Sequence, residues 1–177
     1  MDVLLSNAEV SEKNAWFSFP LGAPNINDIN LQLLHELALV HSTDRTAPLL
    51  VQGVDSTVHD LQCFVPKDAT PEQLNALAIK IDYMKPIETV YFEAALKIKQ
   101  PRNMEDILRI SEELNRCEML MDVCSFNDLG RLLVQIGIVE VSDEDRPGLD
   151  YDKIGADYQE KHGGIFMGYS YITMGGL

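Results

Sequence analysis

The first third of the chain carries apolar positions at the spacing of strands. Residues 15–21 alternate apolar and polar side chains with a period of two, which predicts a half-buried strand. The apolar runs 3–5 and 48–54 predict two more strands. Over 29–38 the apolar positions recur at intervals of three and four, which predicts a helix.

After residue 66 the apolar period becomes helical. Thr70 and Gln73 form a capping box that predicts a helix starting at residue 71. Pro86 suits the first turn of a second helix, because proline has no backbone N–H to lose there. Asn103 is expected to cap a third helix, whose apolar stripe extends to Cys117.

The last third mixes both periods. Ser125 with Asp128 predicts a helix start, and Gly137 predicts its end. An acid-rich loop is expected over 142–150, followed by a short amphipathic helix from Tyr151 and a single final strand over 165–172.

These elements predict an α+β protein of three subdomains. Residues 1–65 form an N-terminal α/β subdomain, 66–121 a helical middle subdomain, and 122–177 an acidic C-terminal α/β subdomain with a helix and a strand. The chain has 177 residues, of which 46% are apolar. That supply is enough for a buried core. No apolar run reaches the ~20 residues of a membrane helix, so we expect a soluble cytoplasmic protein that does not contact a membrane.

The cysteines and histidines do not suggest a cofactor site. Cys63, Cys117 and Cys124 form no CxxC pair, and we expect free, buried thiols. The four histidines are scattered, without the spacing that places two ligands on one helix face. We therefore assign no metal and no cofactor.

Negative charge is concentrated at the two ends of the chain. The formal net charge is -14, and both the first and the last third are acidic, whereas the middle third is nearly balanced. The expected partner-binding acidic surface consists of Asp122, Asp128, Glu140, Asp143, Glu144, Asp145, Asp150, Asp152, Asp157 and Glu160. Such a surface repels nucleic acid and attracts basic proteins.

One hypothesis for the function is hydrolysis by a pair of carboxylates. Glu112 with Glu113, or Asp150 with Asp152, would be the acid and base of a hydrolase. Adjacent acids are common on solvated faces, and no His, Ser or Cys stands beside them in a recognised arrangement. We therefore expect a protein that is not an enzyme.

Four motifs, in order, resemble those of the ArdA family of antirestriction proteins. They are AWFSFP at 15–20, EQLNALA at 72–78, DLGRLLV at 128–134, and LDYDKIGADY at 149–158 with the following GGIF at 163–166. The third resembles the segment known in that family as the antirestriction motif.

The resemblance implies an elongated, modular protein from a mobile genetic element such as a conjugative transposon. It would mimic DNA, occupy the DNA-binding site of a Type I restriction-modification enzyme, and act without catalysis and without binding nucleic acid itself. It also implies a homodimer. The alternative is an acidic adaptor or scaffold protein of a mobile element, which binds a basic partner unrelated to restriction.

The apolar residues around the third motif have two interpretations. Leu129, Leu132, Leu133 and Ile136 recur at helical spacing. We assign them first to the core and second to a dimer seam.

Overall fold

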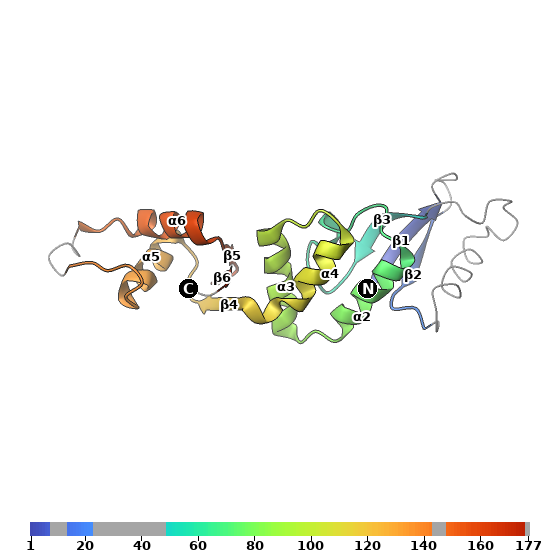
Figure 1. The fold of residues 1–177 in the computed structure, drawn as a ribbon, viewed down its shortest axis with the longest axis horizontal. Coiled ribbons are helices and arrows are strands. Elements are labelled where there is room, and N and C mark those ends of the chain that lie inside the picture. The colour runs from blue at the N-terminus through green and yellow to red at the C-terminus, as the bar shows by residue number, and fades with distance from the viewer. Residues whose placement is uncertain (8–13, 23–48, 143–147, 176–177) are drawn as a thin grey trace, which may run out of the picture. The chain divides into compact units, whose positions relative to one another are not determined.

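The structure, a computed structural model, describes residues 1–7, 14–22, 49–142 and 148–175. Within these ranges it contains five α-helices and two antiparallel sheets of three strands each (Figure 1). The predicted α+β class is therefore confirmed. The predicted helix over 29–38 and the acids of 143–145 lie outside the described residues.

The N-terminal sheet is built from the alternating segments of the sequence. Its strands are β1 (Asp2–Asn7), β2 (Asn14–Ser18) and β3 (Leu49–Asp55), in the order β2-β1-β3. Val3 on β1, Phe17 on β2 and Val51 on β3 are buried, whereas Trp16 is 55% exposed. The period-two pattern therefore predicted both the strand and its buried face.

Three helices follow the sheet, and each begins where the sequence predicted. They are α2 (Pro71–Asp82), α3 (Pro86–Lys99) and α4 (Met104–Glu112). The hydroxyl of Thr70 accepts a hydrogen bond from the Gln73 N–H at 3.3 Å, and the Gln73 side chain accepts one from the Thr70 N–H at 3.0 Å. The Asn103 side chain accepts a bond from the Asp106 N–H at 2.8 Å. These contacts satisfy backbone donors that a helix start leaves without partners.

The third helix is shorter than predicted. It ends at Glu112, and a 3₁₀ turn at Leu114–Arg116 leads directly into strand β4 (Cys117–Met121). Leu114 and Cys117 are buried, as the stripe suggested, but they are not helical. The five residues of β4 thus form a strand, although they lie in the middle subdomain that was predicted to be helical. Their pairing with residues 170–174, far along the chain, overrides the helical spacing of the apolar residues.

The last third contains two helices and a hairpin. The helices are α5 (Phe126–Gln135) and α6 (Tyr151–His162). The single predicted strand over 165–172 is wrong: β5 (Ile165–Met167) and β6 (Ser170–Met174) pair antiparallel around a turn that contains Gly168. Gly168 has φ 58, a conformation that glycine adopts without strain.

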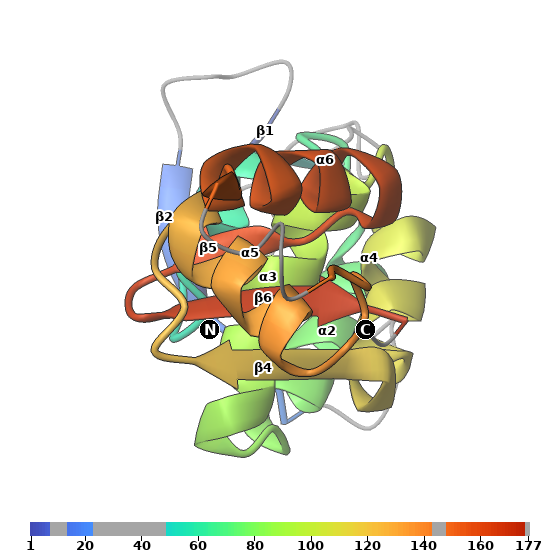
Figure 2. The same cartoon turned by 90° about the vertical axis from the view of Figure 1, so that its left-hand side faces the viewer.

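The C-terminal sheet has the order β4-β6-β5. Helices α5 and α6 pack against each other and lie over one face of this sheet (Figure 2). The core beneath them contains Val123, Leu129, Leu133, Tyr158 and Tyr171. Burial raises the pKa of Tyr171 to about 12, and its hydroxyl donates to the carbonyl of Gly163 just after α6.

The chain divides into two compact units. The first contains Met1–Leu96 and Gln100–Glu112, and the second contains Lys97–Lys99 and Glu113–Leu177. The predicted boundaries at residues 65 and 121 stay a prediction. No helix within the described ranges has both the length and the apolar character needed to cross a membrane.

Candidate protein-binding surface

Two of the predicted surface carboxylates lie at the starts of the helices of the second unit, where Ser125 caps α5 and Asp150 caps α6. Asp128 accepts hydrogen bonds from the Ser125 hydroxyl at 2.7 Å and from the Cys124 N–H at 3.2 Å, and Asp150 accepts one from the Lys153 N–H at 3.0 Å. The Ser125 hydrogen bond, followed by the bond from Cys124, lowers the pKa of Asp128 below its ordinary value. Both carboxylates also stabilise the positive ends of their helix dipoles. Their negative charge therefore stabilises the two helix starts and also contributes to the charge of the surface.

Two glycines bring the backbones of α5 and α6 into direct contact. A β-carbon at Gly130 would lie well inside 3.0 Å of the carbonyl oxygen of Tyr151, and one at Gly155 would lie equally close to the carbonyl of Phe126. Each glycine is thus seated on the first residue of the other helix. No larger residue fits there unless the helices separate, so the two glycines set the distance between α5 and α6.

A polar bridge fixes the start of α6 on α5. The Asn127 side-chain amide donates to Asp152 at 2.8 Å and accepts a bond from Arg131 Nε at 2.7 Å. The guanidinium carbon of Arg131 lies 4.6 Å from the ring centroid of Tyr151, which is a cation–π contact. Together with the glycine contacts, this bridge orients the outer face of α6.

The outer face of α6 carries three of the predicted acids, Asp152, Asp157 and Glu160, which we call the α6 acidic face. All three are exposed, and successive helical residues turn by about 100°, so they span an arc of about 140°. The opposite side of the helix carries Gly155 and Tyr158, both buried. The helix therefore directs these three carboxylates into solvent.

Lysines share α6 with these carboxylates, and Lys153 lies within the same arc, but they form no ion pair with them. Lys153 and Lys161 are also exposed on α6, but no carboxylate of the described acidic surface lies within ion-pair distance of a described lysine or arginine. Of the ten predicted acids, the structure describes Asp122, Asp128, Glu140, Asp150, Asp152, Asp157 and Glu160. Apart from the half-buried Asp128, these are exposed.

The remaining predicted acids are less closely grouped. Asp122 follows β4 with φ 61, and its N–H donates to the carbonyl of Tyr169 at 2.8 Å. Glu140 follows α5 in the chain and is exposed. Asp143, Glu144 and Asp145 lie outside the described residues, so their membership of the surface stays a prediction.

The apolar residues assigned to the core or a dimer seam divide between two environments. Leu129 and Leu133 are fully buried, and Leu132 packs against the same cluster. Ile136 is 49% exposed, so the core interpretation is wrong for this residue. The dimer seam stays a prediction.

The carboxylates of the hydrolase hypothesis have structural partners. Glu112 pairs with Lys80 at 2.7 Å, and Glu113 pairs with Arg116 at 3.1 Å. Asp150 caps α6, and Asp152 accepts the bond from Asn127. These contacts explain why the acids stand where they do without invoking an acid–base pair.

The cysteines differ from the prediction. Cys117 is buried, and burial raises the pKa of its thiol, an effect that nearby Lys99 partly offsets. Cys63 and Cys124 are exposed, so the prediction of buried thiols is wrong for these two. None of the three forms a disulfide with another described residue. Across the described ranges, no group of three His, Cys, Asp or Glu side chains is arranged to hold a metal ion.

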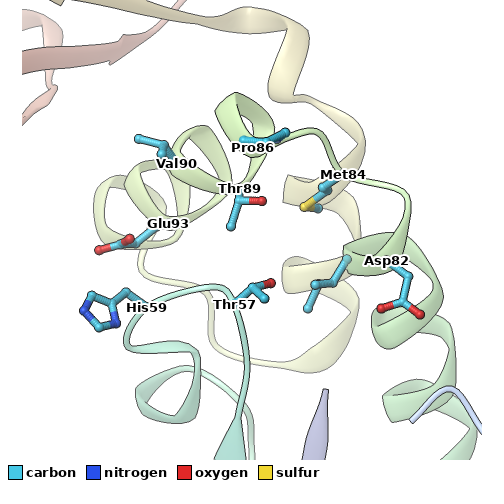
Figure 3. Close-up of a pocket in the computed structure, with 9 residues that line it drawn as sticks. Thr57, His59, Asp82, Met84, Pro86, Thr89, Val90 and Glu93 are labelled. Atoms are coloured by element: carbon cyan, nitrogen blue, oxygen red, sulfur yellow. The ribbon is translucent and has the colours of Figure 1, made fainter.

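A groove in the first unit was not foreseen from the sequence. It has a volume of ≈ 700 Å³ and lies between α3 and the loop that follows β3, with the end of α2 at one side (Figure 3). Val90 and Thr89 line it from α3, Thr57 and His59 from the loop, and Asp82 from α2. Its residues come from three separate segments. The only local signal in the sequence was Pro86, which marks the boundary between α2 and α3.

Comparison with known proteins found no family model that matches the chain and no curated protein that matches it.

Proposed function

We propose that this chain is an antirestriction protein that mimics DNA and competes for the DNA-binding site of a Type I restriction-modification enzyme. One observation carries the proposal: the described acids of the last third, all exposed except the half-buried Asp128, form no ion pair with a described basic residue. A protein groove built to bind DNA exchanges counterions for phosphate charge. Carboxylates that no lysine or arginine of the fold neutralises are the groups that can take the place of phosphates there.

The positions of the family-like motifs support the same function. The segment 128–134 lies in α5, and most of 149–158 lies in α6, the two helices held together by Gly130 and Gly155. Both glycines belong to these motifs. Two of the four segments that resemble ArdA therefore contain the glycines that fix the orientation of the α6 acidic face.

Binding through this surface should be collective. An exposed ion pair contributes about 0–1 kcal/mol, because water and salt screen it. No single carboxylate is expected to dominate, and loss of inhibition should require several changes. Inhibition abolished by one neutralisation would contradict a mimicry mechanism.

Restriction of incoming DNA provides the direct test. The chain is expressed in two otherwise identical bacterial strains, one with an active Type I system and one without it, and each is challenged with unmodified phage or plasmid. We expect higher plating or transformation only in the strain with the active system. Equal effects in both strains would favour the acidic adaptor, and no effect in either would overturn the proposal.

A further inference from the structure

The groove of the first unit combines an apolar floor with negative charge. Ile81, Met84 and Val90 provide apolar surface. Asp82 lies at one end of the groove, and Glu93 lies at the other, across from His59 (Figure 3). The volume of ≈ 700 Å³ is enough for two or three side chains of a bound segment.

Asp82 creates an unusually unfavourable charge arrangement. It is the last residue of α2, where the helix dipole already presents its negative end. The basic residue in that last turn, Lys80, pairs instead with Glu112 at 2.7 Å. Asp82 is exposed and forms no ion pair with a described residue. A cation placed beside Asp82 would therefore be attracted by both the carboxylate and the helix end.

We infer that this groove binds a short segment of the partner protein that carries an arginine or lysine next to an apolar side chain. The apolar side chain would cover Ile81 and Val90, while the cation would lie beside Asp82. The inference rests on the proposed function, because a DNA-binding enzyme is rich in such basic segments. It adds a contact that DNA itself cannot make, since phosphates would be repelled by Asp82 and have no apolar surface to bury.

This contact would give the inhibitor selectivity. A surface that imitates only the phosphates of DNA can bind any basic DNA-binding groove. An apolar pocket adds the requirement that the partner supplies a matching side chain. The groove lies in the first unit and the α6 acidic face in the second. The two contacts can therefore be changed separately.

Binding of blocked pentapeptides to the full chain tests the groove. One peptide carries arginine between leucine and valine, and the matched peptide carries glutamate in place of the arginine. We expect the arginine peptide to shift the amide NMR signals of Thr57, Met84 and Val90, and the glutamate peptide to have no effect. Equal binding of the two peptides, as a general apolar or small-molecule pocket would show, would overturn the inference. Shifts confined to other residues would do the same.

Two variants sharpen the result. Asp82→Lys should weaken binding of the arginine peptide by about fivefold or more, because it replaces attraction by repulsion. Val90→Trp should block the groove without changing its charge. The control is Glu72→Lys, which makes the same charge change at an exposed position in the first turn of α2. Unchanged binding in both groove variants, with circular dichroism confirming the fold, would overturn the inference.

The restriction assay separates the two proposals. If the chain inhibits restriction but does not bind the arginine peptide, the groove inference fails and the proposed function stands. If the peptide binds in the groove but restriction is unaffected, the proposed function fails and the groove remains a site for a basic segment of another partner.

Discussion

The segment 80–116 and the segment 122–160 differ in whether their carboxylates form ion pairs with described basic residues. In the first, Glu112 pairs with Lys80 and Asp106 pairs with Arg109. In the second, the described carboxylates cap helices or point into solvent, and none pairs with a described lysine or arginine. Glu112 and Asp106 thus have their charge balanced within the fold, whereas the acids without a described ion-pair partner, which include Asp82 in the first segment, remain available to a cation of a partner.

The difference has a simple electrostatic consequence. A carboxylate already paired with a lysine contributes little to the field at a distance, because the two charges cancel beyond their separation. Several unpaired carboxylates on one helix face add their fields, and the sum extends about one Debye length, ~8 Å at physiological salt. We therefore propose that the main partner-binding surface lies in the second segment, although the middle third has a similar number of acids.

The largest expected effect comes from breaking the support of the α6 acidic face. Gly130→Ala or Gly155→Ala forces a β-carbon into the backbone of the facing helix, and we expect a loss of about 3 kcal/mol in the free energy of unfolding. Urea unfolding followed by circular dichroism measures it. Gly148→Ala is the matched control, because a β-carbon there meets nothing within 4 Å. Equal stability of the three variants would refute the close approach of the helices.

The next effect is on inhibition. Neutralising the α6 acidic face together, with Asp152→Asn, Asp157→Asn and Glu160→Gln, should weaken inhibition about tenfold or more, whereas each single change should weaken it less than about threefold. Titration of purified protein against a Type I enzyme measures the effect.

A matched neutralisation in the first unit provides the control. Asp68→Asn, Glu72→Gln and Glu105→Gln remove the same charge from three other exposed positions. These changes should leave inhibition within about twofold. An equal loss in both triple variants would mean that net charge alone, and not the α6 acidic face, determines binding.

Acid should destabilise the second unit through its helix cap. The folded-state pKa of Asp128 is lowered, chiefly by the Ser125 hydroxyl, so its stabilising contribution is complete above the unfolded-state pKa and is lost as pH falls through the folded-state value. Ser125→Ala should therefore reduce stability at neutral pH and lessen the further loss between neutral pH and pH ~3. Urea unfolding at the two pH values measures both effects, and an unchanged acid response would contradict the cap.

The typical cost of losing a serine N-cap is ~1 kcal/mol. The same substitution at Ser111 is a useful comparison, because that hydroxyl donates within its own helix to the carbonyl of Leu108 and caps no helix start. Ser111→Ala should show no pH-dependent effect.

The smallest expected effect compares two arginines. Arg131→Ala removes the contact with the Tyr151 ring and the bond to Asn127, and we expect a loss of ~1 kcal/mol. Arg109→Ala removes only a surface ion pair with Asp106, so its cost should be below ~0.5 kcal/mol. Thermal or urea unfolding measures both changes in the free energy of unfolding. A larger loss of stability for Arg109→Ala than for Arg131→Ala would contradict this ranking.

Local signals in the sequence predicted most of the fold. Thr70 with Gln73, Pro86, and Ser125 with Asp128 all mark helix starts, because capping depends on residues a few positions apart. Strand β4 was missed, because the pairing of Cys117 with Met174 joins residues far apart in the chain. No local period reports such a partner. The β5–β6 hairpin is local, and the turn at Gly168 that divides the two strands was overlooked.

The candidate surface was predicted only in part. The sequence identified the acids, and the helical spacing of Asp152, Asp157 and Glu160 follows once α6 is known. The contacts of Gly130 and Gly155 depend on the distance between α5 and α6 in space. The order of apolar and polar residues along a single sequence does not give that distance. The groove at Asp82 was missed for the same reason, since three separate segments form it.

We propose that carboxylates of the second unit without a described ion-pair partner take the place of DNA phosphates in the enzyme. The most direct measurement is competition: fluorescent duplex DNA bound to a purified Type I enzyme is titrated with the chain at several salt concentrations. We expect the chain to displace the duplex completely and its affinity for the enzyme to fall steeply as salt rises. A complex holding enzyme, duplex and this chain together, or an affinity that does not depend on salt, would contradict it.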